Sequence, residues 1–203
     1  MLELTPEFTR AVEYARQTHK TYRKGTEVPY LAHLLGVTAL VLGEAGHVGF
    51  AVTEDMAIAA LLHDAVEDEG GMPRLRDIEE KFGANVAKIV EGLSDSFAED
   101  GHKKKPWEER KREYVARLWK EPESTLLVSA ADKLYNARAI LEDYRQIGPE
   151  VWKRFKRGRK DQLRYFEELL KVFTARCADW RIVEELRRTV TELERISAGE
   201  RSD

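Results

Sequence analysis

The chain has 203 residues, of which 42% are hydrophobic and 35% charged, and its formal net charge is −3. This length and composition exclude an intrinsically disordered chain and are typical of one folded globular domain. The small negative charge gives no indication of a nucleic-acid partner, and no apolar stretch approaches the length that spans a bilayer.

Cys177 is the only cysteine, which excludes an internal disulfide framework and a zinc ribbon. The N-terminal sequence MLELTPEFTRAVEYA lacks the basic and apolar regions of a secretory signal. We therefore expect a cytoplasmic protein without a membrane partner. We expect a single domain over residues 1–203, with its core at about 5–177 and a C-terminal helix at about 179–197.

Helical signals recur along the chain, whereas strand signals hardly appear. Thr5 and Pro6 predict the N-cap and first position of a helix, and Gly25 and Pro29 predict a loop before a second helix at about 31–44. Thr53 predicts the N-cap of a third helix. Further helices are predicted at about 74–82, 84–93, 106–120, 123–145, 149–156, 159–177 and 179–197. The expected fold class is an all-α bundle.

The third predicted helix leads directly into the segment LLHDAVED, residues 61–68. Its last six positions hold His63, Asp64, Glu67 and Asp68 after a run of apolar residues. Because positions three and four apart share one face of a helix, we expect His63 beside Glu67 and Asp64 beside Asp68. Such groups are costly to bury without a partner, so they face either water or a ligand.

Two other predicted helices each place a metal-ligand type among apolar residues. His33 lies in PYLAHLLGV, and Asp132 lies in LLVSAADKLYNA. Together with His63 and Asp64, they would form a mixed nitrogen and oxygen site. Such a site suits Mn²⁺, Fe²⁺ or Zn²⁺ better than Ca²⁺ and leaves positions open for water or a phosphoryl oxygen. The sequence thus predicts a catalytic metal centre made by His33, His63, Asp64 and Asp132.

A cation at such a centre can activate water and polarise a phosphoryl oxygen, while Glu67 or Asp68 takes the proton. The first hypothesis is therefore metal-assisted hydrolysis. Taken alone, any one of these residues would be better interpreted as a hydrogen-bonded core histidine or a solvated acid. His19 is expected to have a structural role, and His47 is expected at the surface.

An early His, a distant His-Asp pair and a still more distant Asp resemble the metal signature of the HD-domain phosphohydrolases. The resemblance narrows to the hydrolase domain of the RelA/SpoT group, and most of all to its stand-alone small alarmone hydrolases. It runs from the first predicted helix to the helix that contains Tyr165. The segments that carry it, in order, are HKTYRKGTEVPYLAH, IAALLHDAVED, IEEKFGANVAKIVEGLSD and VSAADKLYNARAIL. There are three departures. Arg23 follows His19 one residue sooner than in the pattern, Tyr135 stands where the pattern usually has His, and VEGLSDSF replaces a VDGVTK type of run.

The resemblance implies an HD-domain helical bundle whose metal is Mn²⁺. It implies that Glu67 and Asp68 match the pair that activates water. Arg23 and Lys24 match a basic pair around the guanine base, and Asn136 matches an asparagine that contacts the nucleoside. The implied reaction removes pyrophosphate from the ribose 3′ position of ppGpp or pppGpp and returns GDP or GTP. The implied partner is thus a small nucleotide, and we expect no attached synthetase domain.

Several alternatives stay open at this stage. The same metal centre would serve an HD hydrolase for another nucleotide or phosphorylated metabolite. A binding module that senses a nucleotide without hydrolysing it would need a pocket but no base, so Glu67 and Asp68 favour an enzyme. Arg23 and Lys24 would also be unremarkable as exposed loop charges. The basic clusters Lys103–Lys105 and Lys153–Lys160, and a homo-oligomeric state, have no firm assignment.

Overall fold

The computed structural model describes residues 2–68, 70–97 and 104–199, apart from the side chain of Asp68. Within these residues the secondary structure is helical except for a single bridge between Tyr22 and Pro29. The all-α prediction is therefore confirmed. The elements are α1 (Pro6–Thr18), α2 (Tyr30–Gly43), α3 (Glu54–Leu62), α4 (Ala65–Asp68), α5 (Gly71–Phe82), α6 (Ala84–Leu93), α7 (Trp107–Leu118), α8 (Glu123–Ile147), the 3₁₀ helix η1 (Gly148–Arg154), α9 (Gly158–Arg176) and α10 (Arg181–Ser197).

The predicted helix starts agree with local capping chemistry. The Thr5 hydroxyl accepts a hydrogen bond from the backbone N–H of Glu7 at 3.1 Å, with Pro6 at the first helical position. Thr53 caps α3 in the same way, by accepting from the backbone N–H of Met56. Some bounds differ: α5 begins at Gly71 rather than at about 74, and the segment predicted at 149–156 is a 3₁₀ helix.

One difference bears directly on the candidate site. Helix α3 ends at Leu62, and His63 and Asp64 form a turn before the short helix α4. The His63 imidazole contributes to this end, because its Nδ1–H donates to the backbone carbonyl of Ala60 at 2.8 Å. His63 and Glu67, expected as neighbours on one helix face, thus lie on a turn and on α4, and both line the same cavity.

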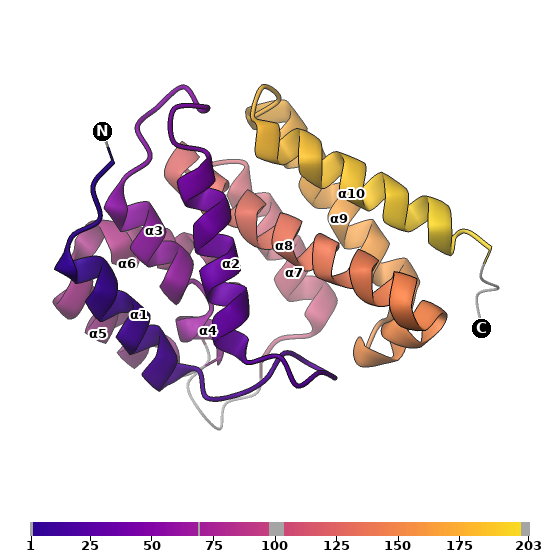
Figure 1. Cartoon of the computed structure of the whole chain (residues 1–203), viewed down its shortest axis with the longest axis horizontal. Helices are drawn as coiled ribbons and strands as arrows, with labels where there is room; N and C mark the ends of the chain where they lie inside the picture. The colour runs from indigo at the N-terminus through magenta and orange to yellow at the C-terminus, as the bar shows by residue number, and fades with distance from the viewer. Residues whose placement is uncertain (1, 69, 98–103, 200–203) are drawn as a thin grey trace.

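Helix α8 is shared by two groups of helices (Figure 1). It contacts α2, α3 and α6 toward one side of the bundle, and α9, α10 and η1 toward the other. Its first half carries an unbroken buried run from Thr125 to Asp132. Asp132, at the end of this run, therefore lies in the interior, where the two groups of helices meet.

Close packing brings α2 and α3 against the rest of the bundle. All residues of α3 from Met56 to Leu62 are buried, and Ala57, Ala59 and Ala60 are fully enclosed. At Gly36 of α2, an added Cβ would lie 2.0 Å from the ring of Tyr135 on α8. No helix among the described residues combines the length and apolar character needed to cross a bilayer.

Candidate active site

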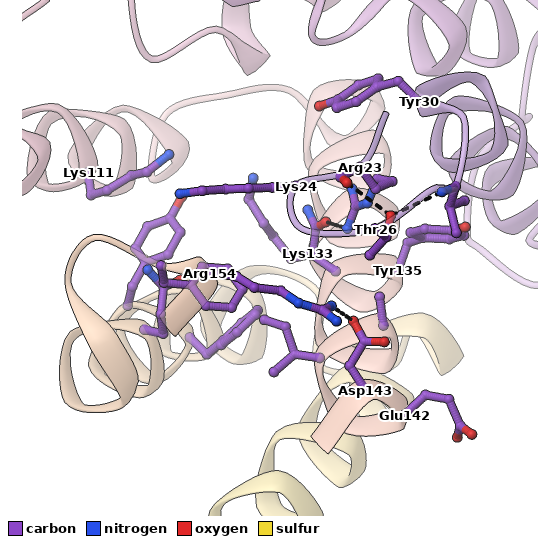
Figure 2. A pocket seen from close by; sticks show the side chains of 18 of the residues that line it. Arg23, Lys24, Thr26, Tyr30, Lys111, Lys133, Tyr135, Glu142, Asp143 and Arg154 are labelled. Atoms are coloured by element: carbon purple, nitrogen blue, oxygen red, sulfur yellow. Dashed lines mark hydrogen bonds and ion pairs between the residues drawn. The ribbon is translucent and has the colours of Figure 1, made fainter. Parts of the chain in front are cut away.

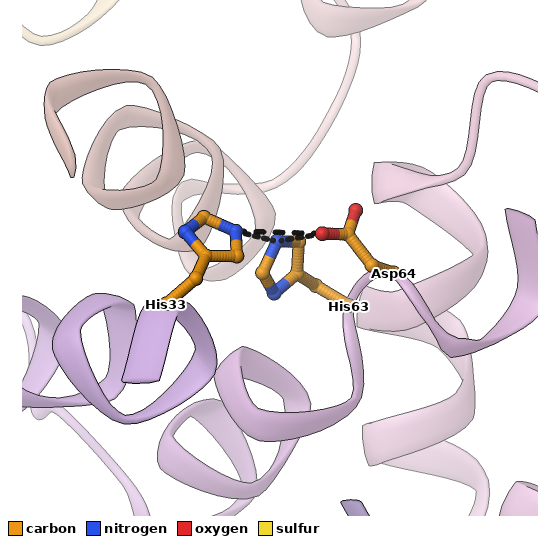
Figure 3. A group of neighbouring side chains, drawn as sticks. All are labelled: His33, His63 and Asp64. Atoms are coloured by element: carbon orange, nitrogen blue, oxygen red, sulfur yellow. Dashed lines mark hydrogen bonds and ion pairs between the residues drawn. The ribbon is translucent and has the colours of Figure 1, made fainter. Parts of the chain in front are cut away.

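The four predicted metal ligands meet at one point, although they come from three separate parts of the chain. His33 extends from α2, His63 and Asp64 from the turn after α3, and Asp132 from α8. Nε2 of His33 lies 3.3 Å from Nε2 of His63. Asp64 Oδ2 lies 3.1 Å from His63 Nε2 and 3.4 Å from His33 Nε2. Figure 3 shows these three side chains pointing toward one another. Asp132 Oδ1 lies 3.4 and 3.5 Å from the same two nitrogens.

The chemistry of this donor set fits a divalent transition metal. One atom from each of His33, His63 and Asp64 lies within 4.8 Å of the others. Because Nδ1 of His63 carries the hydrogen that it donates to Ala60, Nε2 is the nitrogen that remains for a metal. His33 and His63 are only 1% and 3% exposed, so bulk water does not compete for these nitrogens. Two imidazole nitrogens with carboxylate oxygens suit Mn²⁺, Fe²⁺ or Zn²⁺.

The neighbouring imidazole and ammonium groups keep the two aspartates of this group ionised despite their burial. Burial alone would raise the pKa of Asp64, but the His63 and His33 imidazoles hold it well below its usual range. Burial likewise opposes ionisation of Asp132, whose pKa is lowered by the Lys133 ammonium and by both histidines. Lys133 Nζ lies 2.5 Å from Asp132 Oδ2, which leaves Oδ1 facing the histidines. Both carboxylates are therefore anionic.

Glu67 of α4 lines the same cavity of about 220 Å³ as His63, Asp64 and Asp132. Burial raises the pKa of its carboxyl to about 7, with Lys111 opposing this shift and the neighbouring Asp95 adding to it. A carboxyl with this pKa can accept or release a proton near neutral pH. The side chain of Asp68 lies outside the described part of the chain, so its role stays a prediction.

A second cavity of about 480 Å³ shares lining residues with the first, and Figure 2 shows the side chains that line it. Arg23, Lys24 and Asn136, the three residues expected to bind substrate, all line it. Arg23 donates a hydrogen bond to the Asn136 side-chain oxygen at 2.9 Å, and its guanidinium lies 5.7 Å from the centre of the Tyr135 ring. The residues common to both cavities are Tyr30, Lys111, Lys133, Asn136 and Tyr165.

Several residues of the site were not singled out by the sequence. The Tyr30 hydroxyl donates to Asp64 Oδ2 at 2.6 Å, and the Lys111 ammonium lies 2.6 Å from Asp95 Oδ2. For Lys133 the sequence does give an indication, because it follows Asp132 in an apolar run and a cation buried there needs an anionic partner. Tyr30 and Asp95 had none, since a tyrosine beside proline and an aspartate between serines are ordinary in loops.

The remaining histidines and the basic clusters fall in different surroundings. His19 is buried and stacks on Tyr30 with ring centres 5.1 Å apart, whereas His47 is exposed, as predicted.

Lys104 donates to the Glu67 carbonyl at 2.6 Å, and Lys103 lies outside the described residues. From the cluster at 153–160, Arg154 reaches the larger cavity and pairs with Asp143 (Figure 2).

Comparison with known proteins gives the same family by two routes. A family model described as an HD domain matches residues 11–163. The zebrafish (Danio rerio) guanosine-3′,5′-bis(diphosphate) 3′-pyrophosphohydrolase MESH1 is 35% identical over 70% of this chain and 71% of its own length. The human (Homo sapiens) protein of the same name is 36% identical over 70% of this chain and 72% of its own length.

Solved structures share the fold. One described as "a metazoan ortholog of SpoT", which "hydrolyzes ppGpp and plays a role in starvation responses", superposes with a TM-score of 0.72 at 23% identity. The likeness covers 94% of this chain and 97% of that one. A Listeria monocytogenes EGD-e protein superposes with a TM-score of 0.63 at 26% identity, covering 82% of this chain and 99% of its own.

Proposed function

This chain belongs to the HD-domain family, and we propose that it is a metal-dependent hydrolase that removes pyrophosphate from the ribose 3′ position of ppGpp and pppGpp, giving GDP and GTP. The relatives named for this activity span most of the chain, which supports the proposal. The single observation that carries it is the meeting of His33, His63, Asp64 and Asp132 beside a cavity lined by Arg23 and Lys24.

We propose that the ion is Mn²⁺ and that His33, His63, Asp64 and Asp132 hold it. Such an ion would supply Lewis-acid stabilisation of phosphoryl oxygens and a lowered pKa for water. The protein's own contribution is to keep Asp64 and Asp132 ionised in a nearly enclosed place. The Tyr30 hydroxyl adds orientation by donating to Asp64.

In this proposal Glu67 takes the proton from the attacking water on a carboxylate oxygen. The water oxygen joins the phosphorus attached to the ribose 3′ oxygen, and the bond between that phosphorus and the 3′ oxygen breaks. The 3′ oxygen ends with a proton and the pyrophosphate leaves. Glu67 suits this step because its pKa of about 7 balances proton acceptance against release. Asp68, the second residue of the predicted pair, would orient the same water.

The larger cavity has the features that a guanosine nucleotide would require. The Arg23 guanidinium is a planar cation whose orientation is set by Asn136 and by the Tyr135 ring. Such a plane can stack on a purine base. Lys111 and Lys133 lie where both cavities meet and would face the phosphates between the base and the metal. Asn136 would contact the nucleoside.

We further propose that the protein acts in the cytoplasm on a small nucleotide, without a nucleic-acid partner. The test of the function is incubation of metal-free and Mn²⁺-loaded protein with ppGpp, GTP and deoxynucleoside triphosphates, with pyrophosphate and phosphate followed separately. Metal-dependent release of pyrophosphate from ppGpp alone is expected. Equal release from all substrates would instead support a less specific HD hydrolase, and no turnover with any metal would support a nucleotide sensor.

A further inference from the structure

Asp95 is an almost fully enclosed carboxylate just beyond the end of α6. Its side chain is 2% exposed and is bound by two consecutive cations near the start of α7. Arg110 Nη1 contacts Asp95 Oδ1, and Lys111 Nζ lies 2.6 Å from Oδ2. Both oxygens therefore have a cationic partner. A carboxylate this deeply buried is stable only when it is paired in this way.

Arg110 links this pair to the candidate active site. The same nitrogen, Nη1, that contacts Asp95 also lies 3.1 Å from Oε1 of Glu67. One guanidinium nitrogen thus bridges the carboxyl groups of Asp95 and Glu67, and Lys111 adds a second cation to the group. Because the Arg110 side chain is only 14% exposed, it cannot turn out into water without losing both partners.

Lys111 is the second connection. It lines both the metal-side cavity and the larger cavity, and its ammonium lies 5.2 Å from the centre of the Tyr165 ring. A lysine side chain has many rotamers, and fixing one costs conformational entropy. The bond to Asp95 selects the rotamer that holds the cation at the junction of the two cavities.

We infer that Asp95 is a positioning residue of the active site, which sets the contact of Arg110 with Glu67 and the place of Lys111 between the two cavities. It acts through these two cations, and directly on Glu67 through its own charge, rather than on the substrate. The inference rests on the proposed function, because that function gives Glu67 the proton transfer.

The consequence of removing the charge follows from the bridge. In Asp95→Asn the side chain keeps its size, but Arg110 has Glu67 as its only remaining carboxylate among these contacts. A full ion pair with Arg110 makes Glu67 a weaker proton acceptor, and Lys111 loses its anchor. Changes in groups that orient active-site residues typically cost about 10- to 100-fold in activity. We expect kcat to fall by that factor while the affinity for Mn²⁺ stays within about twofold.

The experiment is a double-mutant cycle with Mn²⁺-loaded protein and ppGpp. It compares Asp95→Asn, Glu67→Gln and the double variant by kcat, KM, Mn²⁺ affinity and thermal unfolding. Because Asp95 acts in part through Glu67, Asp95→Asn should lower kcat by a smaller factor in the Glu67→Gln background than in the parent protein. The inference would be overturned if the double variant lost kcat by the product of the two single-variant factors, or if Asp95→Asn left kcat unchanged.

Glu44→Gln is the matched control. Glu44 is also a buried carboxylate at a helix end, with its side chain 8% exposed and paired with Arg181 at 3.2 Å, but it lies outside both cavities. It should lose stability comparable to that lost in Asp95→Asn while keeping kcat. If Asp95→Asn does not fold, Arg110→Lys replaces it in the cycle. A lysine keeps the charge, but its ammonium reaches less far than the Arg110 Nη1 that contacts both carboxylates, so the bridge is lost and the same result is expected.

A readout that needs no turnover separates this inference from the proposed function. NMR titration of the metal-free protein follows the Glu67 carboxyl, which faces Arg110 and Lys111 of α7, Asp95 after α6, and Asp64. The pKa of Glu67 should be lower in Asp95→Asn than in the parent protein. An unchanged pKa would overturn the inference whatever the substrate. A lowered pKa in a protein that does not hydrolyse ppGpp would refute the proposed function but leave the coupling intact.

Discussion

The side-chain amide of Asn136 donates a hydrogen bond to Asp132 Oδ1 at 2.6 Å. The same Asn136 accepts a hydrogen bond from Arg23, so one residue joins the candidate metal centre to the loop expected to hold the base. Asp132 Oδ1 is also the oxygen that faces the His33 and His63 nitrogens. One amide therefore connects the proposed metal site to the proposed nucleotide site.

Asn136→Ala should raise KM for ppGpp by about tenfold and weaken Mn²⁺ binding to a smaller extent. The lost hydrogen bonds are worth about 1.5 kcal/mol, and both Arg23 and Asp132 lose a partner. Steady-state kinetics and a Mn²⁺ titration measure the two effects. Arg138→Ala, at an exposed position of the same helix that pairs with Glu185, is the control and should change neither quantity. An Asn136→Ala enzyme with unaltered KM would contradict the role given to this amide.

Asp132→Ala and Glu67→Gln should separate metal binding from proton transfer. Asp132→Ala removes a ligand and leaves Lys133 without its buried partner, so it should abolish both bound Mn²⁺ and turnover. Glu67→Gln keeps the proposed ligands and should retain Mn²⁺ while lowering kcat by about 10²- to 10⁴-fold. Metal analysis of the purified variants, together with kcat, tests both statements. Two fully active variants would show that these roles are wrong.

Gly36→Ala should destabilise the fold by about 1–3 kcal/mol, because the new methyl group would overlap the Tyr135 ring and force α2 away from α8. Denaturant unfolding measures the change. Gly43→Ala in the same helix has open space around the added carbon and is the control. It should raise stability by about 0.4–1 kcal/mol through a less flexible unfolded chain. Equal effects at the two positions would argue against the close contact.

The stability of the metal-free protein should depend on pH through Glu67. Its folded-state pKa of about 7 lies above the ordinary value of 4.5, so the folded protein keeps a proton that the unfolded chain releases between these values. The resulting stabilisation is complete below the unfolded pKa and is lost as the pH rises through about 7. Unfolding in EDTA at about pH 5 and about pH 8 should show the parent protein losing stability relative to Glu67→Gln. A pH-independent difference would contradict this.

The sequence predicted those parts of the site where burial conflicts with residue type. His33 and Asp132 stand in apolar helical runs, where an imidazole or carboxylate is costly unless it binds something. Thr5 and Thr53 marked helix starts through the local chemistry of caps.

The remaining features depend on contacts that no local pattern encodes. The turn at His63 arises because a side-chain nitrogen replaces a backbone donor at the carbonyl of Ala60. Helical periodicity alone favours continuing the helix there. Asp95 lies in a polar segment that reads as a solvated loop, and only the approach of Arg110 and Lys111 from α7 turns it into a buried carboxylate.

The central claim is that His33, His63, Asp64 and Asp132 hold a single divalent ion. A crystal structure of the protein grown with Mn²⁺, with anomalous data collected on both sides of the manganese absorption edge, tests it directly. We expect one anomalous peak within coordination distance, about 2.0–2.3 Å, of both His Nε2 atoms and of oxygens from Asp64 and Asp132. The claim would be contradicted by these side chains enclosing no peak, with manganese bound elsewhere or absent.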